Sequence, residues 1–203
     1  MKNNIVDDLR LFKSQVYGKF TEVNAEVHVT YDIKDDDELV AFVDACKSHD
    51  IKMIGIDLMN GETHVMTSER IRAPLHEIPS VIKHTLNDLW KYRAIRFKVE
   101  TDINCMTDDL KKMVTYYESH IDCDISTLDK YNYVGSFVQL HNYKISRNIK
   151  KDIDEISITK RYDVESNDIY DEYNTLVEHG IAKTKLEIEC VIFDSNLELD
   201  ANW

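Results

Sequence analysis

The sequence predicts an α+β fold made of two tandem ferredoxin-like units, each with the element order βαββαβ and an antiparallel sheet. Three observations predict it: segments in which apolar and polar residues alternate, segments with apolar residues at helical spacing, and the return of the same order of segments in the second half of the chain. We expect an N-terminal helical extension over residues 1–20, a first repeat over 21–104, and a second repeat with a C-terminal tail over 105–203.

The first repeat opens with residues 25–31, where apolar and polar side chains alternate as in a half-buried strand. Asp35 to Asp37 would cap the helix that follows. Asn60-Gly61 predicts a type I′ hairpin turn with positive φ at both residues. A second helix over 78–90 and a strand over 94–100 complete the order.

The second repeat has the same order in a different sequence. The pattern predicts a strand at 117–121, a helix at 127–141, a hairpin at 143–163, a helix from Ser166 to Gly180, and a strand at 185–191. Gly180 can end its helix in a left-handed conformation. The connection over 102–112 contains neither Gly nor Pro, so we expect the two repeats to pack without a flexible linker.

Both repeats carry Glu-x-His in their first strand, as Glu26-Val-His28 and Glu118-Ser-His120. Residues two apart in a strand share a face, and the helices of such a unit cover the other face. Glu118 and His120 would therefore lie on the open face of the second sheet, together with Glu187 and Glu189.

This open face is the candidate site. Glu118 could orient His120, while Arg161 holds an anionic group, an arrangement suited to acid–base chemistry. The alternative is an ordinary solvated sheet face, where cross-strand pairs of acidic and basic residues are normal. Two ligands on one strand are too few for a metal site, so we expect no metal and no cofactor.

A resemblance adds further candidates. Tyr117-Glu-Ser-His-Ile121, Ser146-Arg147-Asn148, Thr159-Lys-Arg161 and the ending from Phe193-Asp-Ser-Asn to Trp203 resemble a family of proteins with duplicated αβ repeats and no known activity. The resemblance singles out five residues as candidates for ligand binding: Ser146, Arg147, Asn148, Asp194 and Asn196. Alternatively, Asp194-Ser195-Asn196 is a turn with Asx hydrogen bonds, and Trp203 is an apolar plug against the second unit.

The charge limits the choice of partners. Thirty-eight acidic against 25 basic residues give a net charge of −13, which disfavours nucleic acid because polyanion binding depends on Lys and Arg. No stretch has the roughly 18 apolar residues of a membrane helix, and the N-terminal residues lack a secretory apolar segment. We expect a cytoplasmic protein without a membrane or nucleic-acid partner, and a homo-oligomer is compatible with the sequence.

These observations favour a protein that binds a small anionic ligand on the polar face of the second repeat. One alternative is a non-enzymatic interaction module whose sheet faces pack together or on a partner protein. Another is a phosphoester or triphosphate hydrolase of the tunnel type, whose strands alternate acidic and basic residues as Lys98-Val-Glu100 and Glu187-Ile-Glu189 do in part. The sequence leaves open whether the protein is an enzyme.

Overall fold

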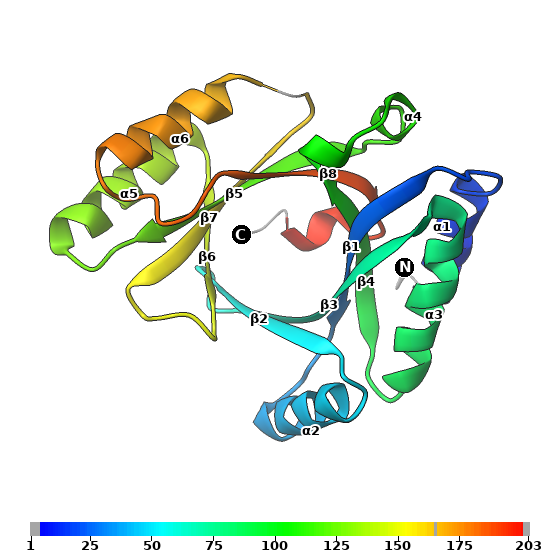
Figure 1. The fold of residues 1–203 in the computed structure, drawn as a ribbon. Helices are drawn as coiled ribbons and strands as arrows, with labels where there is room; N and C mark the ends of the chain where they lie inside the picture. Colours follow the sequence, from blue (N-terminus) through cyan, green and yellow to red (C-terminus); the bar gives the residue numbers. More distant parts are fainter. Residues whose placement is uncertain (1–4, 165, 201–203) are drawn as a thin grey trace. The chain divides into compact units, whose positions relative to one another are not determined.

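The structure, a computed structural model, describes residues 5–164 and 166–200 (Figure 1). Within these residues it contains six α-helices and eight strands, which confirms the predicted α+β class. The described chain forms two compact units, the first made of 5–54, 64–115 and 191–200 and the second of 55–63, 116–164 and 166–190. Strands β2 (Lys52–Leu58) and β8 (Glu187–Asp194) each contribute one part of their length to either unit.

In the first unit the strands neighbour one another in the order β2-β3-β1-β4-β8. The strands not yet given are β1 (Glu22–Tyr31), β3 (Thr63–Pro74) and β4 (Ala94–Asp102). β1 is antiparallel to both of its neighbours, and Glu26 lies opposite Arg70 on β3 and opposite Glu100 on β4. One polar position of β1 thus faces charged residues on both sides.

The helices of the first unit pack on the apolar face of its strands. They are α1 (Ile5–Gln15), α2 (Asp36–Ser48), α3 (Ile78–Asp88) and the short α4 (Asp108–Lys111). Val27, Val29 and Tyr31 of β1 join Phe42 of α2 and Phe12 of α1 in the buried core, as the alternation predicts. Asp35 caps α2 as expected, since its side chain accepts a hydrogen bond from the Glu38 N–H.

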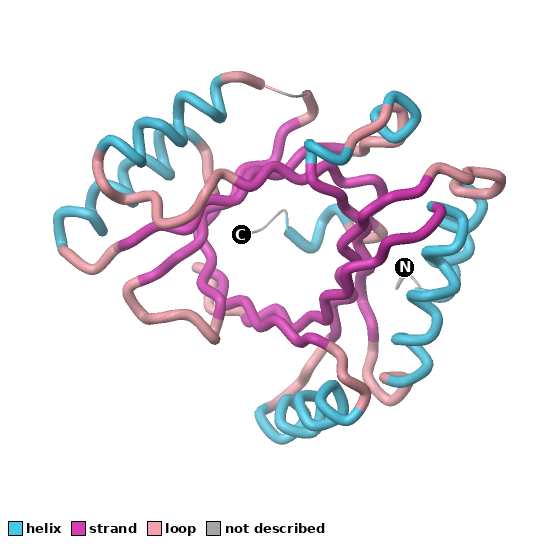
Figure 2. Tube along the Cα trace, in the orientation of Figure 1, coloured by secondary structure: helices cyan, strands magenta, loops and turns pink. Residues whose placement is uncertain are grey.

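In the second unit the strand order is β2-β6-β7-β5-β8. The new elements are β5 (Tyr116–Asp124), α5 (Leu128–His141), β6 (Lys144–Asn148), β7 (Glu155–Tyr162) and α6 (Asp168–Glu178). β5 and β7 pair in antiparallel register, with Glu118 opposite Arg161 and His120 opposite Thr159. Figures 1 and 2 show α5 and α6 side by side on one face of these strands, where Ile121, Ile158 and Phe137 form the core.

The remaining helical turns are 3-10 helices at Leu75–Glu77, Ile103–Cys105 and Leu197–Asp200. The element order therefore reads βαββαβ in each half, from β1 to β4 and from β5 to β8, as predicted. The predicted Trp203 plug lies outside the described residues.

Two predicted turns have different outcomes. Gly180 has φ of +63° after α6, which confirms the left-handed helix end. The type I′ turn at Asn60-Gly61 is wrong, because only Gly61 of the pair has positive φ, at +86°. The Asn60 side chain instead accepts a hydrogen bond from the Glu62 N–H at 3.0 Å, which closes an Asx turn.

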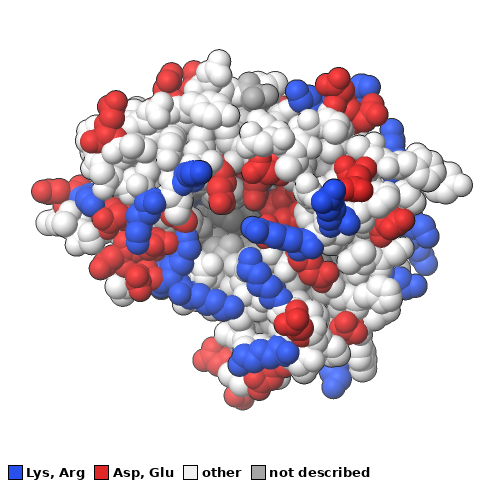
Figure 3. Space-filling view, viewed as in Figure 1, with Lys and Arg blue, Asp and Glu red and all other residues white. Residues whose placement is uncertain are grey.

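Among the described residues, no helix is long and apolar enough to cross a membrane. On the face drawn in Figure 3, acidic and basic side chains are interspersed, so the net charge of −13 does not describe every local surface.

Candidate functional site

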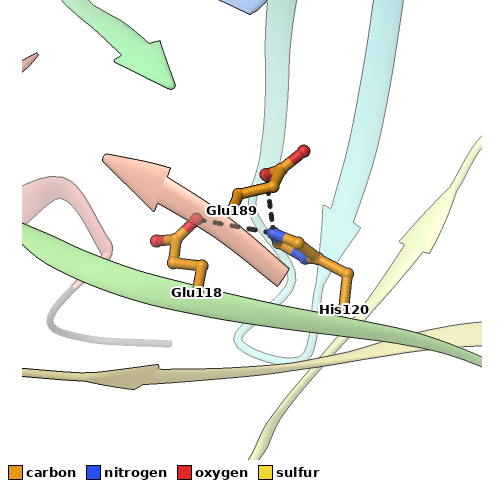
Figure 4. Close-up of side chains that lie close together, drawn as sticks. All are labelled: Glu118, His120 and Glu189. Atoms are coloured by element: carbon orange, nitrogen blue, oxygen red, sulfur yellow. Dashed lines mark ion pairs between the residues drawn. The ribbon is translucent and has the colours of Figure 1, made fainter. Parts of the chain in front are cut away.

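Three side chains converge on the polar face of the second unit (Figure 4). Glu118 and His120 lie two residues apart on β5 and therefore share a face. Glu189 comes from the neighbouring strand, β8. His120 Nε2 lies 3.1 Å from Glu189 Oε2 and 3.6 Å from Glu118 Oε2, so a single ring nitrogen faces two carboxylates.

The imidazole of His120 is held from its other side. Its Nδ1 lies 3.0 Å from the hydroxyl oxygen of Thr159, which is directly opposite on β7. This contact fixes the orientation of the ring and aims Nε2 at the two carboxylates.

The ionisation of His120 follows from competing effects. Burial disfavours the charged ring, but the negative charges of Glu189 and Glu118 outweigh it and raise the pKa to about 10. At neutral pH the ring is therefore an imidazolium between two carboxylates, and Nδ1–H donates to the hydroxyl of Thr159.

Glu118 also binds a second cation. Its Oε1 accepts hydrogen bonds from Arg161 Nε at 3.2 Å and Nη2 at 2.8 Å, while its Oε2 faces His120. The guanidinium of Arg161 stacks on the ring of Tyr116, with Cζ 4.0 Å from the ring centroid. Arg161, Glu118 and His120 thus form one continuous row of charges.

The first unit contains a closely related group. His28 Nε2 lies 2.7 Å from Glu100 Oε1 and 3.9 Å from Glu26 Oε1. Arg70 donates from Nε to Glu26 at 3.0 Å, just as Arg161 donates to Glu118. Lys98 Nζ lies 2.5 Å from the second oxygen of Glu100.

The two groups match residue for residue across the repeats. Each residue of the group in the first unit has a counterpart in the second. Glu26 corresponds to Glu118, His28 to His120, Arg70 to Arg161, and Glu100 to Glu189. The position of Lys98, two residues before Glu100, is occupied in the second unit by Glu187. The recurrence of Glu-x-His therefore extends to an arginine on one neighbouring strand and a second glutamate on the other.

The three predicted ligand-binding residues of β6 do not act together. Ile145 packs in the helix-side core, so Arg147, two residues on, lies on that same face, opposite to the face of His120. There Arg147 Nη2 contacts Asp57 Oδ2 on β2 at 2.9 Å. Ser146 lies on the polar face, and Asn148 accepts a hydrogen bond from the backbone N–H two residues later.

Asp194 and Asn196 lie in the first unit, where they anchor the end of the described chain. Both oxygens of Asp194 are bound by Arg96 of β4, at 2.8 Å to Nε and 2.6 Å to Nη2, and the two side chains are at most 5% exposed. The Asn196 N–H donates to Asp194 Oδ1 at 3.0 Å, which is the Asx turn weighed as the alternative. These contacts give both residues a structural role.

The sequence placed Glu189 on the same open face as Glu118 and His120 but gave it no role, and it did not indicate Thr159 or Tyr116. No protein-family model and no curated protein sequence matches this chain.

Proposed function

We propose that the protein binds a small anionic ligand carrying a phosphoryl or carboxylate group on the polar face formed by β5 and β7. One observation carries the proposal: two cations, the Arg161 guanidinium and the His120 imidazolium, share this face, and each side chain is 29% exposed. They occupy neighbouring cross-strand positions, whose Cβ atoms are about 7 Å apart in an antiparallel sheet. The oxygens of one small anion can therefore contact the Arg161 guanidinium while the positive charge of His120 lies close by.

The orientation of Arg161 supports this proposal. Glu118 binds one edge of the guanidinium and Tyr116 stacks on its plane. A planar guanidinium that is already oriented loses little side-chain entropy when an anion binds, and its fork of N–H groups matches the oxygens of phosphate.

The architecture that we infer for the sheet adds support. The order β4-β1-β3-β2 in the first unit recurs as β8-β5-β7-β6 in the second, and we propose that both units are ferredoxin-like. In such a unit the helices cover one sheet face, so ligand-binding side chains can project from the other. The matched charged groups lie on this second face in both repeats.

Hydrolysis of a phosphoester or triphosphate is a second candidate. The observation that favours it is the protonated state of His120 at neutral pH, since its pKa is raised to about 10. An imidazolium beside an arginine-bound phosphoryl group could donate a proton to the leaving oxygen. Phosphate release from ATP or p-nitrophenyl phosphate, measured for the wild type and His120→Gln, tests this candidate separately from binding.

Ligand-induced thermal stabilisation tests the binding proposal. Phosphate, pyrophosphate, ATP and citrate are each titrated against the wild type, Arg161→Lys and Arg161→Ala in metal-free buffer. We expect at least one anion to raise the Tm of the wild type, with a smaller rise for Arg161→Lys and none for Arg161→Ala. Each rise is measured from the variant's own Tm, because the substitutions also alter basal stability.

Arg147→Ala is the matched control, because Arg147 lies in the same unit on the opposite face. It should keep the full anion response. A response lost in Arg147→Ala but retained in Arg161→Ala contradicts the proposed location. A wild type that responds to none of the anions favours the interaction module, whose sheet face contacts a protein partner.

A further inference from the structure

The comparison of the two charged groups shows a difference at one position. In the first unit, the Lys98 ammonium lies 2.5 Å from Glu100, so the group of Glu26, His28 and Glu100 includes its own lysine. In the second unit the corresponding position is Glu187. The second group therefore has a carboxylate where the first has an ammonium.

We propose that Glu118, His120 and Glu189 bind a divalent cation, which displaces the proton from His120 Nε2 into solvent when it binds. The inference does not depend on the anion site, since the ion requires only these three side chains. The bound cation would have the electrostatic role that Lys98 has in the first unit. There the ammonium of Lys98 compensates the negative charge of Glu100, which lies beside His28.

The spacing of the ligand atoms fits a metal. One atom from each of the three residues lies within 4.8 Å of the other two. Ligands that each lie about 2.1 Å from an ion are about 3.0–3.4 Å apart in octahedral or tetrahedral geometry. The distances from His120 Nε2 to the two carboxylates, 3.1 and 3.6 Å, are close to this range.

The orientation of the His120 ring is a second observation that supports a metal site. Nε2 of His120 is buried and forms no hydrogen bond, although it faces both carboxylates (Figure 4). A nitrogen that faces two acidic oxygens in this way can share one ion with both of them. Its Nδ1 contact with Thr159 is the outer contact that metal-binding histidines use to fix the ring.

The donor set indicates which ion fits. One imidazole nitrogen and two carboxylates suit Zn²⁺ or Mn²⁺ better than Ca²⁺, which prefers oxygen ligands throughout. Three protein ligands leave coordination positions for water or for an oxygen of a bound anion. Glu118 presents Oε2 to His120, while its Oε1 accepts hydrogen bonds from Arg161.

Isothermal titration calorimetry of the EDTA-treated full chain with MnCl₂ and ZnCl₂ tests the proposal. We expect one site per chain for the wild type and affinity weaker by about tenfold or more in Glu189→Gln, which keeps the shape of the side chain but removes its charge. Glu187→Gln is the matched control, because it removes the same charge from the same strand outside the three ligands. It should bind within about twofold of the wild type.

His120→Gln provides a second variant if Glu189→Gln folds poorly, and circular dichroism establishes folding for both. The electron paramagnetic resonance spectrum of bound Mn²⁺ should appear for the wild type and Glu187→Gln and be lost for His120→Gln. The proposal is overturned if the wild type binds neither ion, or if Glu187→Gln and Glu189→Gln weaken binding equally. Anion stabilisation measured in EDTA is a separate readout, so either site can fail without the other.

Discussion

Glu118 and Arg161 face each other across β5 and β7, and a single carboxylate oxygen of Glu118 accepts hydrogen bonds from two nitrogens of Arg161. The side chain of Glu118 is 5% exposed, whereas that of Arg161 is 29% exposed. A buried carboxylate that loses such a partner retains its desolvation penalty without this compensation.

Arg161→Ala should therefore lower the free energy of unfolding by about 2–3 kcal/mol, and Arg161→Lys by less. Urea denaturation measures both. The control is Arg72→Ala, which removes an exposed ion pair with Glu22 and should change stability by less than about 1 kcal/mol. Equal effects of Arg161→Ala and Arg72→Ala would show that the burial of Glu118 does not determine the strength of its pair.

The pair of Asp194 and Arg96 is a stronger test of whether burial makes an ion pair costly to break, because both side chains are at most 5% exposed. Asp194→Asn removes the charge while keeping the shape, and leaves the Arg96 guanidinium without this carboxylate. We expect a loss of about 3–5 kcal/mol, measured by urea denaturation. Glu22→Gln, at the exposed pair, is the control, and a loss below about 1 kcal/mol for Asp194→Asn would contradict a structural role for this pair.

Two features of the structure could be predicted from the sequence. The Glu-x-His face of β5 was predictable, because residues two apart in a strand share a face whatever the partner strand. The βαββαβ order was predictable for the same reason, since the periodicity of apolar residues is a local property of each segment.

The exact partners of side chains from distant segments were not predictable. Asp194 pairs with Arg96, 98 residues earlier in the chain, and this pairing depends on the position of β8 beside β4. The inclusion of Glu189 in the site likewise depends on the position of β8 beside β5. The resemblance indicates Arg147 as an anion ligand, but in the structure Arg147 pairs with Asp57 on β2.

The pH dependence of stability should report the state of His120. Its pKa in the folded protein is about 10, above the unfolded value of 6.5, so the folded state binds the proton more tightly. The resulting stabilisation is complete below about pH 6.5 and is lost as the pH rises through about 10. Glu118, Glu189 and Arg161 are the charged groups of this row that influence the titration.

Glu189→Gln removes one of the two carboxylates that hold this proton. In EDTA, the difference in Tm between the wild type and Glu189→Gln should therefore be largest near about pH 6 and shrink toward about pH 10. Glu187→Gln controls for the general loss of one negative charge and should show a nearly constant difference. A difference for Glu189→Gln that grows with pH would show that His120 is not held as an imidazolium.

Alanine substitutions at two glycines of the second unit, Gly135 within α5 and Gly180 just after α6, test the effect of backbone conformation without a change in packing. A Cβ added at either Gly180 or Gly135 would meet no atom within 4 Å, so neither substitution creates a clash. Gly180 has φ of +63° at the end of α6, where an L side chain is strained, whereas Gly135 lies in the interior of α5. Gly180→Ala should lower stability by about 1 kcal/mol, and Gly135→Ala should raise it by about 0.5–1 kcal/mol. Thermal denaturation of the two variants measures the opposite signs. If both substitutions stabilise the protein, then the left-handed residue after α6 is not required to end that helix.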